Sequence, residues 1–286
     1  MIDSVTARLA ASGGDRPVAI ALHCSGASGR EWRHLAQSLE PKFTVIAPDL
    51  IGCGGTPHWG GGPRFSLTDE ARSIVAAMDA VPQPVHLVGH SYGGAVALRA
   101  AIERPHRVAS LSLYEPTAFH VLRSVGFGGN RALMEIQSVA SAVTQAVACG
   151  ADAAAARRFV DYWNGHGAFA ALKPEAQDEL VRYIPKAVLD FQALLSERTP
   201  LVAYRRLRAP LCILSGDRSP EPALLVAQRL ARAINPGALR VVEGAGHMGP
   251  FSHAALVARQ IADHIVAAGT SAGVPADGSA QWDWAA

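Results

Sequence analysis

The sequence has little of several features that would place it in a specialised class. Its 286 residues carry 26 basic and 24 acidic side chains, so no charge excess favours nucleic acid or an acidic membrane surface as a partner. Its four cysteines form no CxxC pair or Cys/His cluster with metal spacing, which argues against a zinc site and a disulfide framework. No apolar run could span a bilayer, and the start, MIDSVTARLAASGGDRP, lacks the apolar core of a secretory signal. We therefore expect a cytoplasmic protein without a membrane span.

About half of the residues are hydrophobic (49%), and short apolar runs recur along the chain. These runs are continuously apolar rather than alternating, which is typical of strands buried on both faces of a parallel sheet. Helical patterns such as Leu67–Ala80, Ala95–Arg104 and Pro222–Ile234 separate several of them. The alternation predicts an α/β fold with a doubly wound, mostly parallel sheet. The expected strands are Val18–Leu22, Phe43–Ala47, Val85–Gly89, Val108–Leu113, Leu211–Gly216 and Leu239–Gly244.

One long interval, residues 117–207, has no convincing strand and only helical patterns. We interpret it as an all-helical cap inserted between two strands, where it would lie over the carboxyl ends of the sheet. Residues 1–116 and 208–268 would then form the core domain. Residues 269–286, rich in small and polar side chains, would form a C-terminal extension to which no function is assigned.

The stretch PVHLVGHSYGGAVALRA holds a serine between glycines, at a point where a strand pattern changes to a helix pattern. Gly89-His90-Ser91-Tyr92-Gly93 fits G-x-S-x-G, the nucleophile elbow, in which a sharp turn exposes the serine beside the N-terminus of a helix. Small neighbours prevent clashes at the strained turn. Ser91 is therefore the candidate nucleophile.

A serine nucleophile needs a base, and the base needs an orienting acid. His247 follows a strand in the Gly-rich loop of LRVVEGAGHMGP and is the candidate base. An acid and then a histidine are expected to follow the serine along the chain. Asp217, after the strand in LCILSGDRSPEP, is the preferred acid because its Gly-Asp turn is the commoner position for such an acid. Glu115, at the strand end in LSLYEP, is the rival acid.

The tetrahedral intermediate of acyl transfer needs fixed hydrogen-bond donors for its oxyanion. The backbone N–H of Tyr92, directly after the nucleophile, is one candidate. The other is the N–H of Ser25 in the loop LHCSGASGREW. His23 is expected to brace this loop rather than to act as a base.

These motifs together resemble those of the α/β-hydrolase superfamily, and the likeness covers nearly the whole chain. The resemblance implies a Ser-Asp-His hydrolase with no cofactor and with a helical cap that forms the substrate pocket. No metal ligands are expected. Related dehalogenases and epoxide hydrolases use an aspartate nucleophile, and Ser91 argues against both. The sequence departs from the family at Cys24, where glycine is usual, and at its short N-terminus, which suggests seven strands rather than eight. The motifs are LHCSGASGREW, VIAPDLIGCGGT, LVGHSYGG, LSGDRSPEP and GAGHMGP.

The expected activity is that of a carboxylesterase that cleaves small to medium esters through an acyl-enzyme. The same catalytic residues could also serve a carbon–carbon bond hydrolase or a cofactor-free perhydrolase. A non-catalytic ligand-binding receptor on the same fold is the alternative from another class. The partner would be a small-molecule ester, and the oligomeric state stays open. Phe119, Phe127, Trp163 and Met248 are the candidate pocket residues.

Overall fold

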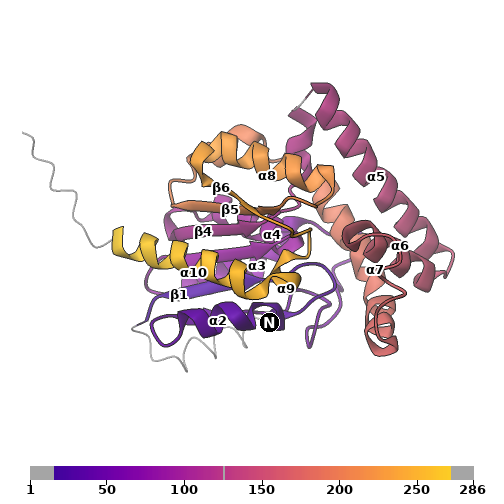
Figure 1. Ribbon diagram of the computed structural model, residues 1–286, viewed down its shortest axis with the longest axis horizontal. Helices are drawn as coiled ribbons and strands as arrows, with labels where there is room; N and C mark the ends of the chain where they lie inside the picture. Colours follow the sequence, from indigo (N-terminus) through magenta and orange to yellow (C-terminus); the bar gives the residue numbers. More distant parts are fainter. Residues whose placement is uncertain (1–15, 125, 272–286) are drawn as a thin grey trace, which may run out of the picture.

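The computed structural model describes residues 16–124 and 126–271, and its described strands form one parallel sheet in the order β2-β1-β3-β4-β5-β6 (Figure 1). The order reverses at β1, as in a doubly wound sheet, and every neighbouring pair is parallel. The expected fold class is confirmed. All six expected strands are present, and the seventh is not found among the described residues; residues 1–15 lie outside them. The strands are β1 (Val18–Leu22), β2 (Thr44–Ile46), β3 (Val85–His90), β4 (Val108–Tyr114), β5 (Leu211–Gly216) and β6 (Leu239–Val242).

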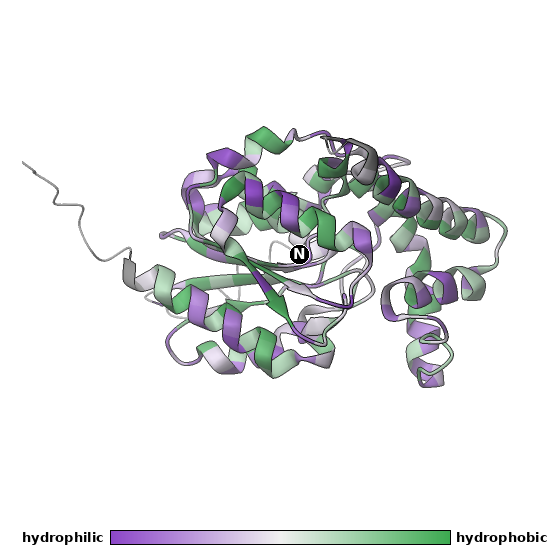
Figure 2. Cartoon of the chain, turned by 45° about the horizontal axis from the view of Figure 1, so that its top comes forward, coloured by the Kyte–Doolittle hydropathy of each residue, from purple (hydrophilic) through white to green (hydrophobic). Residues whose placement is uncertain are grey.

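Helices cover both faces of the sheet, and β1 shows how its residues divide between them. Ala19 and Ala21 pack in a cluster with residues of α2 (Arg33–Leu39) and α10 (Ala254–Ser271). Val18, Ile20 and Leu22 pack on the other face with α3 (Leu67–Ala80), α4 (Tyr92–Glu103) and α8 (Glu221–Ile234). Figure 2 shows the matching stripes of hydrophobic and hydrophilic residues along the helices. Burial on both faces explains the continuously apolar strand sequences.

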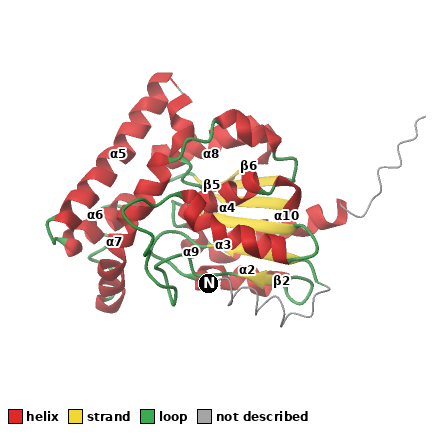
Figure 3. Ribbon diagram, turned by 180° about the vertical axis from the view of Figure 1, so that it is seen from behind, coloured by secondary structure: helices red, strands yellow, loops and turns green. Residues whose placement is uncertain are grey.

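The described residues between β4 and β5 form helices and no strand. They comprise η3 (Phe119–Ser124), α5 (Gly126–Ala148), α6 (Asp152–Asn164), α7 (Pro174–Ser196) and η4 (Leu201–Arg206). Helices α5, α6 and α7 stand together at one side of the sheet (Figures 1 and 3). Helix α7 runs through Pro185 without a break. Proline removes only one backbone donor, and packing of Tyr183, Ile184, Ala187 and Phe191 keeps the helix continuous.

Two further features bear on the expected boundaries. Helix α10 extends to Ser271, so the start of the expected C-terminal extension at residue 269 is still helical. The rest of that extension, residues 272–286, lies outside the described residues. Over the described part of the chain, no helix has the length and apolar character needed to cross a membrane.

Candidate active site

Ser91 occupies the turn between β3 and α4. Its backbone has φ 53° and ψ −117°, in the left-handed half of conformational space where a residue with a side chain is strained. Glycines permit the close packing around it: a Cβ on Gly89 would lie 2.5 Å from Gly93 O, and a Cβ on Gly93 would lie 2.4 Å from His23 O. The strained turn predicted from the motif is therefore present, with Ser91 at its tip.

His247 lies in the loop after β6 and connects two other side chains. Its Nε2 is 2.8 Å from Ser91 Oγ, and its Nδ1 is 2.7 Å from Glu115 Oε2. An ionised carboxylate only accepts hydrogen bonds, so Nδ1–H donates to Glu115 and Nε2 accepts from the Ser91 hydroxyl. All three residues are buried. They form one line of hydrogen bonds of the kind that activates a serine.

The expected pairing of Asp217 with His247 is contradicted by the structure. Asp217 is exposed, and its Oδ1 accepts a hydrogen bond from the Gly244 amide at 2.8 Å. Glu115 follows the neighbouring strand β4, and its Oε1 accepts from the Gly216 amide at 2.7 Å while Oε2 faces the imidazole. Both acids end adjacent strands at the same sheet edge, which is why the sequence pattern could not separate them.

Burial and hydrogen bonding set the protonation of this pair. Burial opposes ionisation of Glu115, but the hydrogen bond and charge of His247 and the Gly216 amide outweigh it and hold the pKa of Glu115 below its ordinary value. Burial lowers the pKa of His247 from 6.5, and Glu115 offsets part of that effect. The carboxylate is thus charged and the imidazole neutral near pH 7, as a general base requires.

The loop after β1 is held by a hydrogen bond at each of its first three residues. His23 Nδ1 donates to Cys24 O at 2.7 Å, and its Nε2 accepts from the Leu50 amide at 2.9 Å. The Cys24 amide donates to Glu31 Oε2 at 2.9 Å. The Ser25 side chain donates from Oγ to Asp190 on α7 at 2.6 Å. His23 therefore braces the loop as expected, and the Cys24 side chain is buried.

The two candidate oxyanion donors are backbone amides of the loop after β1 and of the start of α4. Tyr92 is the first residue of α4, where a backbone N–H has no acceptor within the helix. Within the described chain, no hydrogen bond to another group occupies the Ser25 amide, since only its side chain is engaged. Neither amide therefore has a hydrogen-bond acceptor among the described residues.

Two hollows border Ser91. The larger is a cavity of about 280 Å³ lined by Ser91, His247, and residues of the loop after β1 and of helices α6, α7 and α9 (Gly249–Ser252). The smaller is a recess of about 20 Å³, which Thr117 and Asp190 line but His247 does not. Phe159 and Trp163 of α6 line both hollows.

The candidate pocket residues divide between these hollows. Phe119 lines the recess, Met248 lines the larger cavity, and Trp163 lines both. The side chain of Phe127 lies outside the described residues.

Several polar residues near the site are not among those predicted from the sequence. Lys186 and Asp190 are spaced as an ion pair on one helix face, four residues apart, but their burial was not foreseeable from that spacing. The hydroxyl of Thr117 is buried with no hydrogen-bond partner in the described part of the chain. Nothing in the local sequence distinguishes it from a structural threonine.

One group of metal-ligand type lies beside the site: Cys24, Glu31 and His90, with candidate ligand atoms within 4.8 Å of one another. The Glu31 carboxylate accepts from the Cys24 amide and pairs with His90 Nδ1 at 2.7 Å. His90 Nε2 donates to His247 O at 2.8 Å. Because these hydrogen bonds already engage the carboxylate and both ring nitrogens, we assign the group a structural role.

A model of the alpha/beta hydrolase family matches residues 19–260. The chain belongs to this family. It is 38% identical over 117 residues to lipase LipV of Mycobacterium tuberculosis, a match that covers 41% of this chain and only 42% of that protein. It is 26% identical over 252 residues to the pimeloyl-[acyl-carrier protein] methyl ester esterase of Chromobacterium violaceum, covering 88% and 95% of the two chains.

Among solved structures, an esterase from Thermogutta terrifontis superposes with a TM-score of 0.67 at 19% identity, covering 89% of this chain and 91% of that one. This likeness concerns the fold. The match of the family model to residues 19–260 confirms the family expected from the motifs.

Proposed function

We propose that this protein is a serine hydrolase, a carboxylesterase that cleaves small to medium esters through an acyl-enzyme on Ser91. The observation that carries the proposal is the line of hydrogen bonds from Ser91 through His247 to Glu115. The elbow at Ser91 and the two free amides nearby support it. Glu115 replaces Asp217 as the proposed acid.

The mechanism follows from these contacts. His247 Nε2 takes the Ser91 proton as Oγ bonds to the ester carbonyl carbon, and the Glu115 carboxylate stabilises the resulting imidazolium. The oxyanion accepts from the Ser25 and Tyr92 amides. The carbon–oxygen bond to the alcohol then breaks, and the alcohol leaves with the proton from Nε2. Water attacks the acyl-enzyme with the same histidine as base, which releases the acid and restores the Ser91 hydroxyl.

The two hollows suggest where each part of the ester binds. The leaving alcohol must lie within reach of His247, which lines only the larger cavity. The acyl group then faces the recess, whose roughly 20 Å³ is close to the space for a single water molecule. We infer a preference for short acyl groups on larger alcohols. In this interpretation residues 117–207 act as a cap, because α6 and α7 supply walls to both hollows.

The first test compares wild type with Ser91→Ala on p-nitrophenyl acetate. We expect turnover by wild type and a loss of about 10⁶-fold in kcat for the variant. An unchanged melting temperature and circular dichroism spectrum would show that the variant is folded. A wild type that binds esters but turns none over would favour the receptor alternative. Near wild-type turnover by Ser91→Ala would refute the assignment of Ser91 as the nucleophile.

A second measurement separates ester hydrolysis from the other chemistries of the same residues. Wild type is offered acetate esters, a vinylogous 1,5-diketone with a cleavable carbon–carbon bond, and acetic acid with hydrogen peroxide. We expect kcat/KM to be highest on the acetate esters. Preference for the diketone would indicate a carbon–carbon hydrolase, and peracid formation as the fastest reaction would indicate a perhydrolase.

A further inference from the structure

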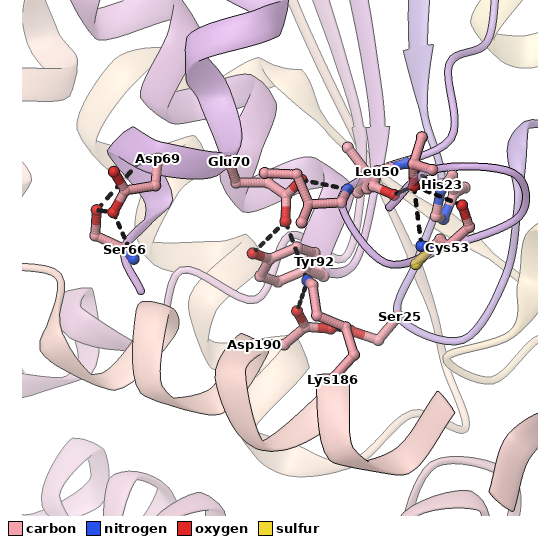
Figure 4. Close-up of polar contacts among 12 residues, drawn as sticks. His23, Ser25, Leu50, Cys53, Ser66, Asp69, Glu70, Tyr92, Lys186 and Asp190 are labelled. Atoms are coloured by element: carbon pink, nitrogen blue, oxygen red, sulfur yellow. Dashed lines mark hydrogen bonds and ion pairs between the residues drawn. The ribbon is translucent and has the colours of Figure 1, made fainter. Parts of the chain in front are cut away.

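A buried cluster of three ionisable side chains joins the helical insertion to the core beside Ser91. Lys186 and Asp190 lie on α7, and Glu70 lies on α3. Lys186 Nζ is 3.1 Å from Glu70 Oε2 and also contacts Asp190 Oδ1. The side chain of Lys186 is 2% exposed, that of Glu70 is 0% exposed and that of Asp190 is 4% exposed. Figure 4 shows Lys186 reaching from its helix towards Glu70, with Asp190 beside it.

The first carboxylate of this cluster holds the loop after β1. Asp190 Oδ2 accepts from Ser25 Oγ at 2.6 Å, and the Tyr183 hydroxyl donates to the same oxygen. The loop also packs against α7 at Gly26, where an added Cβ would lie 3.2 Å from Leu180 and 3.3 Å from Tyr183. Asp190 thus fixes the residue whose amide is a proposed oxyanion donor.

The second carboxylate holds the other proposed donor. Glu70 Oε2 accepts from the Tyr92 hydroxyl at 3.0 Å, and its Oε1 accepts from the Ile51 amide at 2.8 Å. Lys186 Nζ also lies 4.8 Å from the centre of the Tyr92 ring, within range of a cation–π interaction. Helix α3 is fixed just before Glu70 by a capping box in which Ser66 and Asp69 exchange hydrogen bonds.

Lys186 is therefore the shared counterion of two carboxylates, each of which holds one side chain of the proposed oxyanion pair. Two buried carboxylates near each other would repel without a cation between them. The lysine comes from the inserted helix, whereas Ser25 and Tyr92 come from the sheet-forming core. The side chains of Ser25 and Tyr92 are therefore both connected to α7 through this cluster.

We propose that Lys186, Asp190 and Glu70 are positioning residues, which set the separation of the Ser25 and Tyr92 amides and so couple the helical insertion to oxyanion binding. This inference rests on the proposed function, because it takes those two amides as the oxyanion donors. The cluster itself does not touch the reacting atoms. Its effect is on the transition state, where the oxyanion forms, rather than on substrate binding.

The test uses variants that remove single hydrogen bonds to Asp190 or Glu70 and keep the buried charges in place. Ser25→Ala removes the hydrogen bond to Asp190, and Tyr92→Phe removes the one to Glu70. Tyr183→Phe is the matched control, because it removes a hydrogen bond to the same Asp190 oxygen without freeing Ser25. Melting temperatures establish that each variant is folded.

Three quantities are measured for each variant: kcat and KM on p-nitrophenyl acetate, the inhibition constant of a trifluoromethyl ketone that forms a tetrahedral adduct, and the rate at which a fluorophosphonate labels Ser91. For Ser25→Ala and Tyr92→Phe we expect kcat to fall by about 10- to 100-fold with KM within about twofold. The ketone should bind more weakly by a similar factor, and labelling should slow. Tyr183→Phe should resemble wild type in all three.

The inference is overturned if folded Ser25→Ala and Tyr92→Phe keep wild-type kcat and ketone affinity, if only KM changes, or if Tyr183→Phe shows the same losses. The labelling measurement separates this failure from failure of the proposed function. Wild type that is not labelled at Ser91 would refute the proposed function and the inference together. Labelling at Ser91 with equal rates in all variants would refute the inference alone.

Discussion

The indole of Trp163 stacks on the imidazole of His247, with ring centroids 4.1 Å apart and planes 27° from parallel. Trp163 belongs to α6 of the inserted helices, and its side chain also lines both hollows beside Ser91. The insertion therefore reaches the histidine directly. A large apolar ring in this position keeps water from one face of the imidazole and borders both the recess and the larger cavity.

Shortening the Trp163 side chain should change which acyl groups are accepted. In Trp163→Ala the recess and the cavity lose a shared wall, so longer acyl chains gain space. We expect the kcat/KM ratio of p-nitrophenyl hexanoate to acetate to rise by at least about 10-fold, since one methylene in an apolar pocket is worth about 1–3 kcal/mol. Met134→Ala on α5, an exposed position of the same insertion, should leave the ratio unchanged. A uniform change across an acetate-to-octanoate series, in folded protein, would remove the proposed role of the insertion in selectivity.

The two candidate acids should differ sharply in a paired comparison. Glu115→Gln leaves an amide against His247, which cannot stabilise the imidazolium and favours the wrong tautomer, so kcat should fall by about 10⁴-fold. Asp217→Asn changes an exposed side chain that holds the Gly244 amide, and kcat should stay within about threefold. Steady-state kinetics on p-nitrophenyl acetate give both values. If Asp217→Asn lost more kcat than Glu115→Gln, Asp217 would be the catalytic acid instead.

The pH dependence of kcat/KM should reflect a His247 imidazole that is neutral near pH 7. Burial lowers the pKa of His247 below 6.5, so the base stays deprotonated into mildly acidic solution. The acid limb of kcat/KM should therefore have its midpoint below pH 6.5. The Glu115 carboxylate raises this pKa, so in Glu115→Gln the residual activity should show a limb at still lower pH. A wild-type midpoint above pH 7, or a shift to higher pH in the variant, would contradict this picture of the pair.

Thr117 should discriminate between acyl groups of similar size. Its hydroxyl is buried without a partner in the described chain and lines the recess, where a polar acyl substituent could satisfy it. Thr117→Val keeps the shape and removes the hydroxyl. We expect kcat/KM for a glycolate ester to fall by about 10-fold relative to the acetate of the same alcohol, because a buried hydrogen bond contributes about 1–2 kcal/mol. Equal changes for both esters would show that the hydroxyl does not contact the acyl group.

The sequence alone was enough to predict the fold and part of the site. Apolar strands separated by helical patterns predicted the doubly wound sheet, since burial on both faces demands continuous apolar runs. Gly89 and Gly93 around Ser91 predicted the strained turn, because only small residues permit the approach of neighbouring backbone. The role of His247 was predicted from its place after a strand, and the bracing role of His23 was predicted from its place in the loop. These inferences succeeded because each depends on local chemistry and on the order of elements.

Only the tertiary structure decided which acid contacts His247 and what holds the loop after β1. Glu115 and Asp217 both end strands at one sheet edge, and the Gly-Asp turn at residues 216–217 favoured the acid that does not contact His247. The choice depends on backbone angles and on which carboxylate turns inward, as Glu115 does with φ 40°. The contact of Asp190 with Ser25 joins residues 165 positions apart. Such a contact leaves no local pattern, because it arises from the packing of an inserted helix against the core.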